Sequence, residues 1–414
     1  MEASSVRLRD PEFVKDPFPI LDLLRDKLPV FRSDEFNAVV VSRYDDVVAV
    51  LKDAETFSSQ WIHKVRAIFS PQESVRKVLA DGYPDDLALI WADGADHSYH
   101  ADIVRPFLTA AALKLMEPTV REICQEVVDQ LEPGVEVNLV EQFTTPIAIN
   151  TMCAFVGVGR EKVDIVVEGA DAEIALQGAF TTEEQCVEYA RQYVAFQHLL
   201  ADELEDRKAN PKDDLLTAIA NPPDRDDGGK VLDKHLQISL VKLAVIAGNE
   251  TTRGLISQCL LNIANDPSVL DRISNDRAAL ESFIEETLRV SPPVMISYRI
   301  ATRDTEIAGF PVKEGEVVIV STGAANHDPS KFTCPHDHNI DRENVRRHLS
   351  FGFGAHYCIG FGLARMETRL ALETFLERFD PPILSKTHDP ERYPSFLVYN
   401  LHNLPATLRV KSGV

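Results

Sequence analysis

The feature that most restricts the fold is one long helical stretch, residues 232–266, which is apolar through its middle. A helix that is apolar on all sides has to be buried, so we expect this stretch to cross the core. Other helical patterns cover residues 110–131, 143–156, 161–176, 183–206, 278–290 and 359–379. Strand patterns are short, at 30–32 with 38–41, at 135–139 and in patches of 300–320. Because the sequence has no internal repeat and no low-complexity linker, we predict a single, mainly helical domain with small β-sheets over residues 1–414.

The composition excludes several classes of protein. The formal net charge is −22, from 65 acidic and 43 basic residues, which argues against non-specific binding to nucleic acid or to an anionic membrane. The 6 cysteines form no Cys-x-x-Cys pair, which favours a reducing compartment over a disulfide framework. The first residues contain no apolar signal segment, and no run of about 18 apolar residues could form a spanning helix. We therefore predict a cytoplasmic protein with no nucleic-acid partner and no membrane insertion.

A lone cysteine lies between a glycine-rich turn and the last long helical pattern. Residues 351–360 read Phe-Gly-Phe-Gly-Ala-His-Tyr-Cys-Ile-Gly. Gly352 and Gly354 can adopt positive φ, so the backbone can form a tight loop beneath a flat ligand. Cys358 would then lie at a helix N-terminus, where free N–H groups and the helix dipole favour a thiolate, and Gly360 keeps the first turn slim. This pattern indicates an axial iron ligand; the alternative is a buried free cysteine in a glycine-rich bend.

The same stretch resembles the haem-binding signature of the cytochrome P450 family, Phe-x-x-Gly-x-[Arg/His]-x-Cys-x-Gly. Phe351, Gly354, His356, Cys358 and Gly360 match every fixed position. The resemblance implies the cytochrome P450 fold, with haem b between the long central helix and the helix that follows the cysteine loop. It also implies a bacterial-type monooxygenase in which the cysteine thiolate is the axial ligand of the haem iron.

The middle of the long helix carries a second motif, Ala-Gly-Asn-Glu-Thr-Thr at residues 247–252. A glycine followed by hydroxyl residues lowers helix propensity and favours a local opening, although a tolerated kink is the simpler alternative. The motif resembles the oxygen-activation motif of the family. The resemblance implies that Thr251 donates a hydrogen bond to bound dioxygen, that Glu250 supplies protons, and that Gly248 lies against the haem.

A charged pair precedes the cysteine loop. Glu286 and Arg289 lie at i and i+3, a spacing that places both on one helix face. Such a pair is usually a solvated surface pair. Its position before the sequence Ser-Pro-Pro of residues 291–293 follows the order in the resembled family, and this implies a buried structural pair that braces the cysteine loop.

The resemblance also implies basic partners for the haem propionates. The candidates are Arg299, His356, His348 and His97. The chain departs from the family at Ala101, where an arginine is common. Residues that could replace this arginine are Tyr99, His100 and Arg105.

Substrate contacts are implied for residues that are mostly apolar. They are Phe180, Leu243, Ile246, Ala247, Val294, Ile296 and Phe396. We therefore expect a lipophilic small molecule, such as a terpenoid or an aromatic compound, that is hydroxylated or oxidatively dealkylated. For each of these residues, packing in the core is the alternative.

The 414 residues contain no reductase pattern, so we expect the electrons to come from other proteins. The resemblance implies a ferredoxin and a ferredoxin reductase that uses NAD(P)H. Arg342, Arg346 and Arg347 form a basic cluster just before the cysteine loop of an otherwise acidic chain. This cluster predicts a docking surface for an acidic redox partner, with a solvated charged face as the alternative.

Two other functions compete with this interpretation. Cys334, His336 and His338, with His348, His356 and Cys358 downstream, offer ligands for a zinc site, but their spacing is irregular. A non-catalytic haem-thiolate sensor would keep Cys358 and would not need Glu250 or Thr251.

Overall fold

The computed structural model describes residues 8, 10, 13, 15–64, 72–176, 182–225, 228, 229, 231–393 and 395–411. The chain divides into two compact units. Unit 1 comprises Met1–Ser58, Val120–Ile147 and Thr251–Val414, and unit 2 comprises Ser59–Thr119 and Ala148–Glu250. The assignment of residues 1–414 to a single domain stays a prediction.

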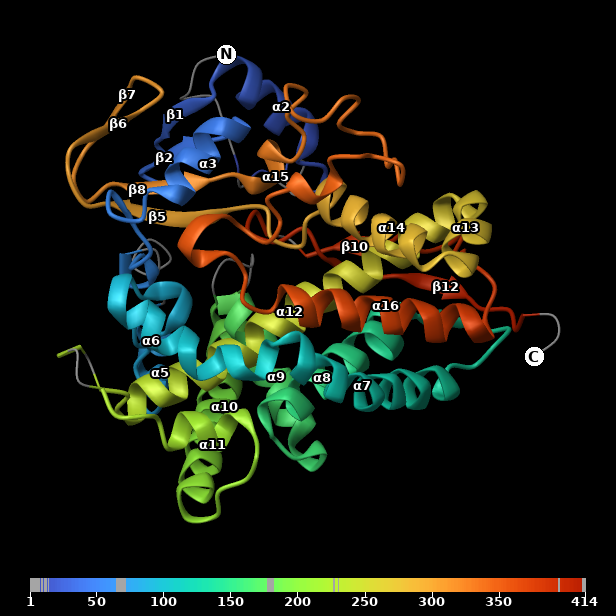
Figure 1. Ribbon diagram of the computed structural model, residues 1–414, viewed down its shortest axis with the longest axis horizontal. Coiled ribbons are helices and arrows are strands. Elements are labelled where there is room, and N and C mark those ends of the chain that lie inside the picture. Colours follow the sequence, from blue (N-terminus) through green and yellow to red (C-terminus); the bar gives the residue numbers. More distant parts are fainter. Residues whose placement is uncertain are drawn as a thin grey trace. The chain divides into compact units, whose positions relative to one another are not determined.

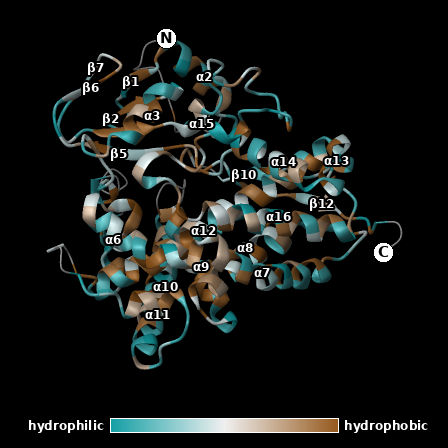
Figure 2. Cartoon of the chain, viewed as in Figure 1, coloured by the Kyte–Doolittle hydropathy of each residue, from teal (hydrophilic) through white to brown (hydrophobic). Residues whose placement is uncertain are grey.

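Unit 1 contains a five-stranded sheet in the order β1-β2-β8-β5-β3. Its strands are β1 (Val30–Ser33), β2 (Ala38–Val41), β8 (Val317–Val320), β5 (Ser297–Ala301) and β3 (Phe57–Ser58). The predicted hairpin is confirmed, because β1 pairs antiparallel with β2. Every residue of β2 and of β8 is apolar and buried, as strands covered on both faces require, and hydrophobic residues gather where β2 meets helix α3 (Tyr44–Lys52) (Figure 2).

Three smaller sheets complete the β-structure of the described residues of unit 1. They consist of β4 (Glu136–Asn138), β12 (Pro405–Thr407) and β9 (Ile383–Leu384); of β6 (Thr305–Ile307) and β7 (Phe310–Val312); and of β10 (Glu391–Arg392) and β11 (Leu401–Asn403). The strand patches expected between residues 300 and 320 are therefore present as β5 to β8.

The helices of unit 1 carry most of the residues discussed below. They are α2 (Phe18–Lys27), α3, α13 (Leu270–Asn275), α14 (Arg277–Val290), α15 (Thr322–Ala325) and α16 (Phe361–Arg378). Short helical turns are η6 (Pro267–Val269), η7 (Val345–Arg347) and η8 (Gly354–His356). Figure 1 shows α15 beside α2 and α3, while α14 packs against α16.

Helices joined by loops make up the described residues of unit 2. Its elements are α5 (Glu73–Leu79), η2 (Leu89–Trp91), α6 (Gly94–Val104), η3 (Arg105–Leu108), η5 (Arg160–Lys162), α9 (Val163–Leu176), α10 (Glu183–Ala209) and α11 (Leu215–Ala220). Helix α10 begins with a capping box formed by Thr182 and Gln185 and packs against α9, α5 and α11 (Figure 1). A side chain at Gly169 would overlap Phe196, so this glycine allows the close approach of α9 and α10.

Three further helices each contribute residues to both units: α7 (Ala110–Gln130), α8 (Thr145–Val156) and α12 (Lys234–Asn265). A π-helical turn, η4 (Val140–Thr144), precedes α8 and accounts for the later start of this helix. Helix α12 confirms the predicted long helix and continues as α-helix through residues 247–252, so the composition of that motif does not break it. Over the parts of the chain described here, no helix has both the length and the apolar character that spanning a membrane requires.

Candidate functional site

The loop that leads to Cys358 needs glycine at two positions. Gly352 and Gly354 have φ values of 73° and 75°, in the left-handed region that favours glycine. A Cβ atom on Gly354 would also lie 2.6 Å from the backbone oxygen of Leu51. The Cys358 N–H donates to the Phe351 carbonyl at 2.8 Å and closes the loop. The tight turn predicted from the two glycines is therefore present.

The cysteine lies directly before α16. Gly360 is the N-cap of this helix, and its backbone N–H is hydrogen-bonded to the Cys358 thiol. A Cβ atom on Gly360 would meet only the Cys358 Sγ atom, at 4.0 Å, so the space beside the sulphur is open. Burial raises the pKa of the Cys358 thiol, although the Gly360 N–H and the charge of Arg365 oppose this. The N–H group at the start of α16 therefore favours the thiolate, as expected, but burial outweighs it, and metal binding would remove the proton.

The surroundings of Cys358 fit a large flat cofactor. Phe353, Tyr357 and Phe361 flank the cysteine in the sequence and are 38%, 43% and 42% exposed. Exposed aromatic rings around one sulphur are a surface that a ring system such as haem can cover. A cysteine sulphur is a suitable axial donor for haem iron. The residues present therefore fit haem b.

The predicted pair of Glu286 and Arg289 is present and fully buried. The Arg289 Nη2 atom lies 2.8 Å from Glu286 Oε1, and both side chains are 0% exposed. Burial alone would raise the pKa of Glu286, but hydrogen bonds and the charge of Arg289 outweigh it and lower the pKa. The remaining Arg289 donors bind the carbonyl oxygens of Asn326, Pro335 and Asp337. The pair therefore holds the segment that precedes the cysteine loop.

Arg342 belongs to this buried pair and not to the predicted surface cluster. Its Nε atom donates to Glu286 Oε1 at 2.9 Å, and its side chain is 7% exposed. Arg346 and Arg347 are exposed, and the nearest carboxylate to Arg346 is that of Glu281, at 3.8 Å. The basic cluster is therefore reduced to two arginines.

A second ion pair, between the buried Glu285 and the partly exposed Arg365, lies next to the first and was not predicted from the sequence. Arg365 donates from Nε and Nη2 to the two carboxylate oxygens of Glu285, with the Nη2 distance at 2.8 Å. His348 Nε2 lies 3.1 Å from Glu285, and His348 Nδ1 accepts the N–H of Ser350. Both ring nitrogens of His348 are thus engaged within the protein. We therefore replace the predicted propionate contact of His348 by a structural role.

The other predicted propionate partners lie in different places. Arg299 is on β5, is 6% exposed, and donates to the Tyr298 carbonyl at 2.7 Å. His356 ends η8, two residues before Cys358, and is partly exposed. His97 is partly exposed on α6 in unit 2. These three remain candidates.

The residues considered as substitutes for the arginine missing at Ala101 are all engaged elsewhere. The Tyr99 hydroxyl donates to the Pro223 carbonyl at 2.8 Å. His100 is buried and its Nδ1 accepts the Leu89 N–H at 3.1 Å. Arg105 forms an ion pair with Asp102. No replacement for the arginine is identified among them.

The motif in the middle of α12 presents its side chains to different surroundings. Glu250 is 3% exposed, whereas Thr251 is partly exposed. A Cβ atom on Gly248 would overlap the Met152 sulphur, so this glycine is needed for packing against α8. Of the predicted substrate contacts on this helix, Leu243 and Ile246 are buried and Ala247 is exposed. Phe180 lies outside the described residues.

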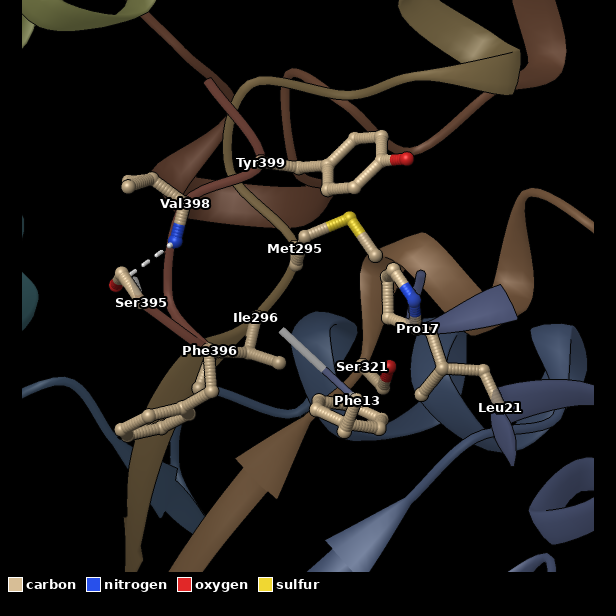
Figure 3. Close-up of a pocket in the computed structure, with 10 residues that line it drawn as sticks. All are labelled: Phe13, Pro17, Leu21, Met295, Ile296, Ser321, Ser395, Phe396, Val398 and Tyr399. Atoms are coloured by element: carbon tan, nitrogen blue, oxygen red, sulfur yellow. Dashed lines mark hydrogen bonds between the residues drawn. The ribbon is translucent and has the colours of Figure 1, made fainter. Parts of the chain in front are cut away.

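The two remaining substrate regions lie side by side. Met295 N–H donates to the Leu397 carbonyl at 2.9 Å, and Val294 forms a β-bridge with Val398. Ile296 and Phe396 are buried and line a pocket of about 20 Å³, which has room for a water molecule but not for a lipophilic substrate. Figure 3 shows Met295 and Ile296 facing Phe13 and Pro17 across this pocket. Val294 keeps part of its side chain exposed.

The zinc alternative is wrong for the part of the chain that the structure describes. There, no group of three or more His, Cys, Asp and Glu side chains could hold a metal ion. The proposed ligands face different partners: His336 binds Asp22 at 2.6 Å, and His338 binds Thr287 at 2.9 Å. A zinc site would need them to converge.

Two buried groups predict a loss of stability in acid. Burial lowers the pKa of His327 from 6.5 to about 4. Between pH 6.5 and 4, His327 is therefore protonated in the unfolded chain but not in the folded chain. Burial would raise the pKa of Glu285, but Arg365 and His348 outweigh it and lower the pKa from 4.5 to about 2. In both cases the unfolded state binds more protons, so the free energy of unfolding falls as the pH falls. Each full shift corresponds to about 3 kcal/mol.

Urea unfolding of His327→Gln at pH 7, 5 and 4 checks this. The variant is expected to lose less stability than the wild type between pH 6.5 and 4, by up to about 3 kcal/mol. His388→Gln, at a side chain that is 68% exposed, serves as the control. Equal slopes for wild type and His327→Gln would contradict the prediction.

The chain is similar to known proteins over most of its length. The Cytochrome P450 family model matches residues 176–409. Cytochrome P450 107B1 of Saccharopolyspora erythraea is 30% identical, over 96% of this chain and 96% of that protein. The 6-deoxyerythronolide B hydroxylase of the same organism is 31% identical, over 90% of this chain and 90% of that protein.

A solved structure, that of an intact type IV self-sufficient cytochrome P450 monooxygenase, matches with a TM-score of 0.89 at 27% identity. The match covers 98% of this chain and 53% of that one, so this chain spans about half the length of that monooxygenase.

Proposed function

This chain belongs to the cytochrome P450 family and is a P450 monooxygenase that uses haem b, and on this basis we propose that Cys358 is the thiolate ligand of the haem. The observation that carries the proposal is the glycine-closed loop that ends at Cys358, with open space at Gly360 and exposed aromatic rings on both sides. Arg299, His356 and His97 are the proposed partners of the propionates. The sensor alternative is not retained, because the chain is an enzyme.

When bound, haem b supplies the activation of dioxygen, so that one oxygen atom enters the substrate and the other leaves as water, with two electrons and two protons consumed. The chain has to deliver those protons. We propose that the buried carboxyl group of Glu250 holds a proton and that the adjacent hydroxyl group of Thr251 passes it on towards the reacting oxygen. Both residues lie on α12, whose unbroken backbone fixes their positions.

Replacing Thr251 by alanine is expected to separate NAD(P)H consumption from product formation. Without the hydroxyl group, proton delivery is misdirected and peroxide is released in place of product. We expect the ratio of product to NAD(P)H consumed to fall about tenfold or more. Turnover with surrogate redox partners, with peroxide assayed in parallel, measures the ratio. Thr251→Ser, which keeps the hydroxyl group, is the control; full coupling in the alanine variant would contradict the proposed relay.

We propose that the substrate is a lipophilic small molecule that is hydroxylated or oxidatively dealkylated. The support comes from apolar side chains at the predicted contacts, of which Ala247 and Val294 are exposed or partly exposed. Leu397, between the pocket-lining residues Phe396 and Val398, is partly exposed and is added as a candidate. Titration of terpenoids and aromatic compounds against the holoprotein, followed as a spin-state shift, tests the class. A response to polar compounds alone would contradict it.

We propose that electrons arrive from a ferredoxin, which is reduced by an NAD(P)H-dependent ferredoxin reductase in the cytoplasm. The six cysteines, all among the described residues, form no disulfide bond, as a reducing compartment favours. Arg346 and Arg347, on η7 just before the cysteine loop, are the proposed contacts for the acidic partner.

Reversing both charges, in the variant Arg346→Glu with Arg347→Glu, is expected to slow reduction by ferredoxin about tenfold or more at low salt, with a smaller difference at high salt. Stopped-flow reduction by the ferredoxin measures this rate. Lys313→Glu, at an exposed position of the same unit, shows the effect of one charge reversal away from η7. The docking proposal fails if the double variant is reduced as fast as the wild type, or if Lys313→Glu slows reduction as much.

A further inference from the structure

We infer that Arg365 is a positioning residue for the cysteine ligand and sets how readily the haem accepts an electron, with Glu285 moderating its charge. The inference rests on the proposal that Cys358 is the axial ligand. It concerns side chains of unit 1 alone, from α14, α16 and the loop between Phe351 and Phe361.

The guanidinium group of Arg365 lies against the aromatic rings of the cysteine loop. Its central carbon is 4.5 Å from the ring centroid of Phe351 and 5.5 Å from that of Phe361. Phe351 is tied to the ligand, because its carbonyl oxygen accepts the Cys358 N–H at 2.8 Å. Phe361 is the first residue of α16. The cation is therefore held on rings at both ends of the loop that carries the sulphur.

Glu285 holds the guanidinium group in this orientation. Two donors of Arg365 bind the two oxygens of one carboxylate, a geometry that fixes the guanidinium plane. The Glu285 side chain is 3% exposed and that of Arg365 is 27% exposed. His348 binds the same carboxylate, and Ser350, two residues further on and directly before the loop, donates from Oγ to the Leu288 carbonyl of α14. The loop and α14 are thus joined around Arg365.

The sign of the effect follows from electrostatics. A positive charge near a thiolate stabilises negative charge there, and the Arg365 guanidinium group lies against the rings of Phe351 and Phe361 at the two ends of the loop that carries Cys358. Addition of an electron makes the haem and its ligand more negative, so a nearby cation favours the reduced form. The carboxylate of Glu285 acts in the opposite direction.

The two members of this ion pair therefore predict opposite shifts. Arg365→Gln removes the cation and is expected to lower the ratio of ferrous to ferric haem at a fixed solution potential. Glu285→Gln leaves the charge of Arg365 uncompensated and is expected to raise this ratio. If the two variants acted only by disrupting the structure around the pair, both would shift the ratio of ferrous to ferric haem in the same direction.

The chain offers a matched control on the same helix. Arg378 is 28% exposed, pairs with Asp129 at 2.8 Å and lies 5.2 Å from the ring of Phe379. Its exposure and its aromatic contact resemble those of Arg365, although its partner Asp129 is 58% exposed, and it is at the far end of α16 from the cysteine. Arg378→Gln tests whether loss of any arginine on this helix has the same effect.

Reductive titration of the holoproteins with dithionite and redox mediators, followed in the Soret band, measures the ratio. We expect Arg365→Gln to lower it about tenfold, which is 59 mV for a one-electron couple. Glu285→Gln should raise it severalfold, Arg365→Lys should restore most of the wild-type value, and Arg378→Gln should leave it unchanged. The inference is overturned if Arg365→Gln and Glu285→Gln shift the ratio in one direction, if neither shifts it, or if Arg378→Gln shifts it as far as Arg365→Gln.

The spectrum of the reduced, carbon-monoxide-bound wild type tests separately the proposal on which this inference rests, that Cys358 is the axial ligand. A red-shifted thiolate-haem band that is lost in Cys358→Ser supports Cys358 as the ligand. If that band is absent from the wild type, the ligand proposal itself fails, whatever the potentials. If Arg365→Gln does not retain haem, Glu285→Gln still decides the matter: a Glu285→Gln ratio at or below the wild-type value overturns the inference.

Discussion

Replacing Arg289 by alanine is expected to lower the free energy of unfolding by about 3–5 kcal/mol, because it leaves the buried Glu286 carboxylate without its ion-pair partner on α14. The change also removes the donors that bind the carbonyl oxygens of Asn326, Pro335 and Asp337. We expect the segment before the cysteine loop to loosen and haem to be lost together with stability. Urea unfolding followed by far-ultraviolet circular dichroism and by the Soret band measures both.

A surface pair on the same helix provides the control for this variant. Arg277 and Glu281 of α14 form an ion pair in which the side chains are 65% and 42% exposed. Arg277→Ala is expected to change the free energy of unfolding by about 1 kcal/mol or less, since exposed pairs contribute little. Arg289→Lys keeps the charge but not the planar set of donors, and should fall between the two. Similar losses for Arg289→Ala and Arg277→Ala would show that the buried pair has no special role.

Replacing Cys358 by serine is expected to abolish the red-shifted band of the reduced carbon-monoxide complex and to reduce monooxygenase activity roughly a hundredfold or more. A serine oxygen does not donate electron density to haem iron as a thiolate does, and this donation favours cleavage of the O–O bond. The side chains are close in size, and the loop is closed by the backbone hydrogen bond from Cys358 to Phe351, so the fold should persist. Absorbance spectra and turnover with surrogate redox partners check the two effects.

Cys334→Ser is the matched control, because Cys334 is an exposed free cysteine of the same unit. It should retain the band and the activity. A wild-type spectrum in Cys358→Ser would assign the ligand to another residue and would remove the basis for the proposed site.

The helices and strands followed closely from the sequence where their patterns are local. Helix α7 occupies Ala110–Gln130 against a predicted 110–131, and α12 occupies Lys234–Asn265 against 232–266. The hairpin of β1 and β2 was also predicted. The parallel pairing of β2 with β8 was not, since it joins residues such as Val41 and Val320 that lie far apart in the chain. Periodicity reports which face of an element is apolar and does not identify what covers that face.

The substrate candidates show the same limit. Ile296 and Phe396 remain predicted contacts for a ligand, and the structure places both, buried, around a pocket that also involves Phe13 and Pro17. An apolar side chain has the same appearance in a sequence whether it meets a ligand or the protein's own N-terminal segment. Only the packing distinguishes the two.

By itself, the sequence determined the family, the glycine-closed loop at Cys358 and the pair of Glu286 and Arg289, because each depends on residues within a few positions of one another. Tertiary structure alone decided the surroundings of these features. Arg342 binds Glu286, 56 positions away, and does not belong to the predicted surface cluster. Arg365 binds Glu285, 80 positions away. The partner of a charged side chain at such a separation cannot be predicted from the sequence around it, because burial and ion pairing depend on which segments the folded core brings together.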